Sequence, residues 1–151
     1  MKILKRNNNN GFTLIEIIVV ITIISLMTTI SLPFYRNINM NLNLSGEIRD
    51  LASDLRQAQQ LSVTEQTNYQ VIINQTENSY SIVNSKTLKK IKEKKLKNDI
   101  TILAISGLIN NTIEFNATGA AISTGNIILT NPNLKQAIIE IKPSGYVKIY
   151  N

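Results

Sequence analysis

The sequence predicts an α+β fold, in which a long N-terminal helix crosses a membrane, continues into an amphipathic helix and packs on an antiparallel β-sheet. Three observations lead to this prediction. Residues 12–32 form an almost unbroken apolar run of 21 residues. Apolar residues then recur at spacings of three and four across residues 43–66. After residue 68, short apolar segments alternate with turn-forming Asn, Gly and Pro.

The apolar run has the length of a membrane-spanning helix. At a rise of about 1.5 Å per residue it would extend about 31 Å, enough to cross a hydrocarbon core of about 30 Å. The alternative is a secretory signal peptide, which normally has a shorter apolar core and a small-residue cleavage site. Here the run continues into LPFYRN. We therefore expect the segment to remain on the mature protein as a single-pass anchor.

Flanking charge predicts the orientation of this anchor. Lys2, Lys5 and Arg6 precede the run, whereas Arg36 is the one basic residue within the first dozen positions after it. Under the positive-inside rule the N-terminus stays in the cytoplasm. The C-terminal domain is then periplasmic or extracellular.

One carboxylate, Glu16, interrupts the apolar run near its start. A charge within hydrocarbon is unfavourable, and such charges are usually paired or functional. Glu16 could protonate or extend toward the interface. Alternatively, it could need a cationic partner inside an assembly.

Composition argues against enzymatic function. The 151 residues include no cysteine and no histidine, so a thiol nucleophile and the commonest general base and zinc ligand are both missing. We find no nucleotide-binding motif, metal cluster or paired-acid site in the sequence. We therefore expect no catalytic residues, no cofactor and no metal. An enzyme tethered by the helix has no residue set in its favour.

The stretch GFTLIEIIVVITIISLMTTISLP resembles the N-terminus of type IV pilins and type II secretion pseudopilins. The resemblance implies a leader of residues 1–11, cleaved by a prepilin peptidase between Gly11 and Phe12, and N-methylation of Phe12. It also implies that Glu16 is the signature acid of the family. Pro33 corresponds to the helix-kinking proline that ends the apolar segment.

The same resemblance gives Glu16 a role. Cleavage creates an amino cation at Phe12, with which Glu16 of a neighbouring subunit could pair. Because an unpaired buried charge is costly, such a pair could set the register of packed helices. The implied partners are other pilin or pseudopilin subunits, membrane lipid and an inner-membrane assembly platform with a separate ATPase.

Residues 34–67 are predicted to continue as an extracytoplasmic amphipathic helix. Its apolar face repeats at helical spacing over six positions: Leu44, Ile48, Leu51, Leu55, Ala58 and Ser62. Asp50 and Asp54 alternate with Arg49 and Arg56, which predicts a solvated opposite face.

Residues 68–151 are predicted to form the β-rich domain. Segments 69–73 and 79–83 flank NQTENS and should form a hairpin, and 136–141 and 146–150 flank KPSG and should form another. Three further strands are predicted at residues 100–105, 112–115 and 126–130.

This part of the chain resembles the GspH/FimT group of minor pseudopilins and minor pilins. The resemblance rests on DLRQAQQLSVTEQTNYQV and on the later IEF, GNIILT and SGYVKIY segments. The main hypothesis is therefore a minor pseudopilin or minor pilin that supports protein secretion or pilus biogenesis.

A lysine-rich stretch, KTLKKIKEKKLK, suggests the alternative hypothesis. Seven lysines crowd into residues 86–97: Lys86, Lys89, Lys90, Lys92, Lys94, Lys95 and Lys97. They could track the phosphates of DNA in a minor pilin for natural transformation. They could equally belong to a long solvated connection between residues 83 and 100, because no aromatic residue lies in the run to stack on bases.

Overall fold

A computed structural model describes residues 11–150, and these comprise one helix and eight strands. The helix, α1, spans Leu14–Thr64. The strands are β1 (Tyr69–Asn74), β2 (Ser79–Asn84), β3 (Lys90–Lys95), β4 (Thr101–Ser106), β5 (Thr112–Phe115), β6 (Gly125–Thr130), β7 (Gln136–Ile141) and β8 (Val147–Tyr150). Two compact units result. Asn37–Asn151 forms the globular domain, and the part of α1 that precedes it is a separate unit.

The α1 helix continues without interruption through Pro33, which lies inside it. A proline cannot donate an amide hydrogen to the carbonyl four residues earlier, here Thr29. The residues on both sides of Pro33 are nevertheless helical, so Pro33 does not divide α1 into two helices. The chain leaves the helix after Thr64 through Gln66, whose φ of 51° is left-handed.

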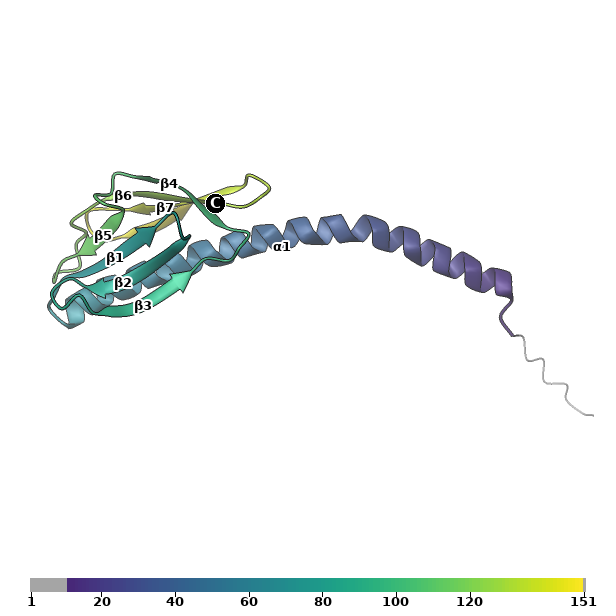
Figure 1. The fold of residues 1–151 in the computed structure, drawn as a ribbon, viewed down its shortest axis with the longest axis horizontal. Helices are drawn as coiled ribbons and strands as arrows, with labels where there is room; N and C mark the ends of the chain where they lie inside the picture. The colour runs from purple at the N-terminus through teal and green to yellow at the C-terminus, as the bar shows by residue number, and fades with distance from the viewer. Residues whose placement is uncertain (1–10, 151) are drawn as a thin grey trace, which may run out of the picture. The chain divides into compact units, whose positions relative to one another are not determined.

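The predicted apolar face of the amphipathic segment is confirmed. All six of its positions are buried in the domain core: Leu44, Ile48, Leu51, Leu55, Ala58 and Ser62. In Figure 1 the strands gather along this C-terminal half of α1. The 3.6-residue period thus places one stripe of the helix against the sheets.

The strands form two antiparallel sheets, with the orders β3-β2-β1-β5 and β4-β6-β7-β8. Both predicted hairpins are confirmed, since β1 pairs with β2 and β7 pairs with β8. Alternate residues of the strands enter one core shared with α1, among them Val71, Ile113 and Ile139, all fully buried. The α+β prediction is confirmed.

One strand was not predicted. Residues 90–95 of the lysine-rich stretch form β3, which pairs antiparallel with β2 and lies at the edge of its sheet. The expectation of an irregular connection is therefore wrong for this segment, although five of its six residues are exposed as expected. Lysines on an edge strand discourage pairing with another chain, which is consistent with this position.

Gln59 of α1 holds two loops of the domain together. Its Nε2 donates a 2.7 Å hydrogen bond to the carbonyl of Gly119, between β5 and β6. Gly145, in the β7–β8 turn, has a φ of +79°, and a Cβ placed there would overlap both the Gly119 carbonyl oxygen and the Gln59 amide. The turn therefore requires glycine for its backbone conformation and for its close approach to the loop.

Candidate assembly segment and lysine-rich strand

The start of α1 brings together the residues that the sequence singled out. Gly11 and Phe12 precede the helix, and Phe12 is 81% exposed. Thr13 Oγ1 accepts a 3.3 Å hydrogen bond from the Glu16 amide, and the Thr13 amide donates a long 3.5 Å bond to Glu16 Oε2. This reciprocal arrangement is a capping box, which satisfies donors that the first turn of a helix leaves unpaired.

Thr13 is a helix-capping residue that the sequence reasoning missed. The available signal was the spacing Thr-x-x-Glu directly before an apolar run, which is the sequence signature of a capping box. In the single chain, Glu16 is therefore not left without a partner. Its carboxylate is exposed and accepts one long hydrogen bond, from the Thr13 amide.

The N-terminal part of α1 is long and apolar enough to cross a membrane. Residues 11–36 include no buried side chain, and large apolar residues such as Leu14, Ile30 and Phe34 are 69–78% exposed. Five hydroxyl groups in this part donate to carbonyls three or four residues earlier: Thr22, Ser25, Thr28, Thr29 and Ser31. Such internal hydrogen bonds leave the segment compatible with lipid.

Strand β3 directs two of its lysines toward α1. Lys94 Nζ lies 2.7 Å from Asp50 Oδ2 and 2.9 Å from Glu47 Oε2. The Glu47 side chain is only 4% exposed, whereas that of Asp50 is 63% exposed. Burial acts to lower the pKa of Lys94, but the neighbouring carboxylates of Asp50 and Glu47 outweigh it, so the pKa is raised overall.

Asp54 is a second buried carboxylate of α1 that contacts β3. Asp54 accepts a 2.8 Å hydrogen bond from the Tyr80 hydroxyl and a 2.7 Å contact from Lys92 Nζ. Burial, and then the hydrogen bond to Asp54, raise the pKa of Tyr80. Asp54 is 5% exposed, so the prediction of a solvated face is wrong at this position. We call Glu47, Asp50, Asp54, Tyr80, Lys92 and Lys94 the helix–strand seam.

The seven lysines do not form one patch. Lys92 and Lys94 belong to the helix–strand seam, and Lys97 donates a 2.9 Å hydrogen bond to Asn43. Lys90 forms an exposed ion pair with Glu93. The remaining three, Lys86, Lys89 and Lys95, are exposed but are spread between the β2–β3 turn and the other end of β3.

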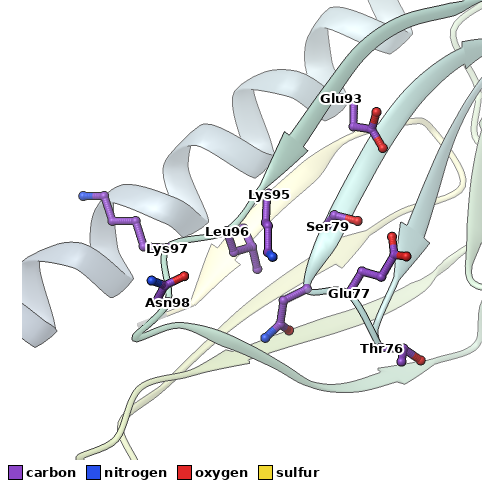
Figure 2. A pocket seen from close by; sticks show the side chains of 9 residues that line it. Thr76, Glu77, Ser79, Glu93, Lys95, Leu96, Lys97 and Asn98 are labelled. Atoms are coloured by element: carbon purple, nitrogen blue, oxygen red, sulfur yellow. The ribbon is translucent and has the colours of Figure 1, made fainter.

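A hollow beside these lysines has mixed charge. It has a volume of about 580 Å³, and its lining includes Glu77 and Glu93 as well as Lys95 and Lys97. Figure 2 shows Glu77 and Glu93 lining this hollow together with Lys95, while Lys97 extends toward the helix. Carboxylates here would repel a phosphate backbone. The arrangement does not favour the DNA-binding hypothesis.

Across residues 11–150, the structure places no group of three or more acidic side chains where a metal ion could be held. The carboxylates that do approach one another are neutralised by lysines of the helix–strand seam. The part of α1 that spans residues 14–36 contributes no residue to the buried core.

Known proteins share a sequence motif with this segment and a fold with the domain. A family model described as the prokaryotic N-terminal methylation motif matches residues 6–32. This range contains Gly11, Phe12 and Glu16. Its first residues lie outside those that the structure describes. A search of curated proteins gives no match.

The fold is similar to solved structures of minor pilins and minor pseudopilins. The type IV minor pilin FimU of Pseudomonas aeruginosa aligns with a TM-score of 0.62 at 11% identity, covering 74% of this chain and 90% of that one. The minor pseudopilin EpsH from the type II secretion system of Vibrio cholerae aligns with a TM-score of 0.61 at 8% identity, covering 72% and 96%. At such identities the likeness establishes the fold. The chain thus joins an N-terminal methylation motif to a minor-pilin-like domain.

Proposed function

We propose that this protein is a prepilin-like structural subunit, a minor pilin or minor pseudopilin that supports pilus biogenesis or protein secretion. The methylation motif and the pilin-like fold support this proposal. The subunit is anchored in the inner membrane by the N-terminal part of α1. Its N-terminus faces the cytoplasm, and its domain is periplasmic or extracellular.

One observation carries the proposal. Residues 12–32 expose a continuous apolar surface, whereas Asn37–Asn151 buries a core of its own. No residue of the exposed segment belongs to that core. An apolar surface of this length needs lipid or other apolar helices around it. Before assembly the membrane would supply the lipid, and after assembly a bundle of like helices would supply the apolar contacts.

The polar start of α1 would then provide alignment. Cleavage by prepilin peptidase between Gly11 and Phe12 would leave an ammonium group at Phe12, directly before Thr13 of the capping box. Glu16 of an adjacent subunit could exchange its long bond to Thr13 for a charged bond to this ammonium. Because an unpaired carboxylate among packed apolar helices is costly, this contact would favour one register. Assembly would also require other subunits and a membrane platform driven by a separate ATPase.

Processing is tested by mass spectrometry of the full chain expressed with a prepilin peptidase. The proposal expects a mature species that begins at Phe12 and carries one added methyl group. Replacing Gly11 by a bulky residue should leave the full-length chain in the membrane. A wild-type chain that inserts but is never shortened would contradict the proposal.

Assembly is tested with two variants that separate charge from helix capping. Glu16→Gln retains the capping geometry but loses the charge, whereas Thr13→Ala loses the cap and retains the charge. We expect Glu16→Gln to be inserted and processed but excluded from filaments. Thr13→Ala should still be incorporated, with a helix start weakened by about 1 kcal/mol. Normal incorporation of Glu16→Gln would show that the pairing account is wrong.

A further inference from the structure

The turn between β6 and β7 presents an exposed leucine in an unfavourable backbone conformation. Leu134 has a φ of 59° and is 83% exposed. Non-glycine residues rarely adopt this left-handed region, and Asn or Gly normally occupies it. Since Leu134 packs little against its own domain, folding alone does not explain a leucine here.

The turn is held firmly to α1. Asn131 is 3% exposed, and its Nδ2 donates a 3.0 Å hydrogen bond to Asn41 Oδ1. The Asn131 Oδ1 accepts hydrogen bonds from the amides of Asn133 and Lys135 at 3.1 and 3.0 Å. Asn133 Nδ2 in turn reaches Asn37 Oδ1 at 3.5 Å. The position of Leu134 is therefore fixed against the first residues of the globular domain.

These first residues lie close to the end of the apolar run. Asn37 follows Leu32 by five residues, a helical rise of about 7.5 Å. The polar layer on each side of a bilayer is about 5–7 Å thick. Between the two, Phe34 and Tyr35 are 69% and 64% exposed, and aromatic residues such as Tyr are typical of this layer. Chain connectivity alone thus keeps the tethered turn within reach of lipid headgroups.

We propose that Leu134 inserts into the interfacial layer of the membrane that anchors the chain. The adjacent Lys135 is exposed and can contact lipid phosphates while the leucine contacts the acyl boundary. The domain then has a second, small contact with lipid that limits its tilt and rotation before assembly. This inference rests on the proposed membrane anchoring.

The chain offers a matched control in the turn between β2 and β3. Leu88 has a φ of 55°, is 72% exposed and is followed by a lysine. This turn instead lies by the C-terminal end of α1, because the Ser85 amide donates to the Asn68 carbonyl. Along α1, Asn37 and Thr64 are about 40 Å apart. Leu88 therefore shares the local features of Leu134 but not its proximity to the anchor.

The absence of native cysteine makes a labelling test direct. Full-length Leu134→Cys, Leu88→Cys and Leu26→Cys would each carry an environment-sensitive fluorophore in liposomes, with or without nitroxide on the upper acyl chain. The protein would be kept dilute so that copies do not meet. We expect blue-shifted emission at position 134 and quenching several-fold stronger than at position 88.

Each other outcome counts against the inference. Equal quenching at positions 134 and 88, with strong quenching at 26, would overturn the leucine contact and leave the anchor standing. A blue shift at 134 without nitroxide quenching, or one that appears only at high protein density, would indicate contact with a second copy and overturn the lipid assignment. No quenching at 26 would refute the membrane anchor, and the inference with it.

Discussion

Replacing Lys94 by methionine removes the one ammonium that the structure places within ion-pair distance of Glu47. Methionine retains most of the apolar stem of lysine, so the change acts chiefly on charge. The Glu47 carboxylate is 4% exposed and would remain buried opposite an apolar group. The variant therefore measures how much the ion pair between Lys94 of β3 and Glu47 of α1 contributes to the unfolding free energy.

The expected magnitude follows from the exposure of each partner. Leaving a buried carboxylate unpaired costs about 3–5 kcal/mol when both partners are fully buried. Lys94 is 24% exposed and Asp50 is 63% exposed, so solvent screens part of this loss and the Asp50 pair contributes little. We expect unfolding free energy to fall by about 2–3 kcal/mol, which lowers Tm by roughly 10 °C for a domain of this size.

The assay is urea unfolding of the Asn37–Asn151 domain, followed by circular dichroism. Lys95→Met is the control, because Lys95 is the exposed neighbour on the same strand, and it should change stability by less than about 0.5 kcal/mol. Adding Glu47→Gln to Lys94→Met should recover part of the loss, since no unpaired carboxylate then remains at position 47. Equal stability of the Lys94→Met and Lys95→Met domains would refute the reasoning.

Three further predictions concern the domain. Tyr80→Phe should cost about 1.5–3 kcal/mol through the lost hydrogen bond to Asp54. Because the folded pKa of Tyr80 is raised, its contribution is present below pH 10.0 and lost at higher pH, so the variant should lose stability less steeply in alkaline urea titrations. Leu134→Asn should raise the unfolding free energy by about 0.5–1 kcal/mol in the isolated domain, because Asn tolerates the left-handed conformation; a lower midpoint in thermal unfolding would contradict this. Gly145→Ala should lower stability by at least about 2 kcal/mol, since its Cβ meets the Gly119 carbonyl, and unchanged thermal unfolding would disprove the steric argument.

Local patterns were enough to predict the N-terminal motif with its apolar helix and most of the strands of the domain. A 21-residue apolar run, a glycine before it and one carboxylate at a fixed position need no tertiary information to be recognised. The buried stripe of α1 and both hairpins also follow from local sequence. Helical periodicity and turn chemistry act over a few residues, so the chain itself contains these signals.

Tertiary structure decided the lysine-rich stretch and the partition into two sheets. Strand β3 has charged residues at most positions and lacks the apolar alternation that predicts a strand. It lies at the edge of its sheet, and its Lys92 and Lys94 side chains form ion pairs with acids of α1. Asp54 is buried because Tyr80 and Lys92, 26 and 38 residues away in sequence, supply its partners. A charge pattern alone cannot separate such a seam from a solvated face, since the difference depends on which distant residues the fold brings within about 3 Å.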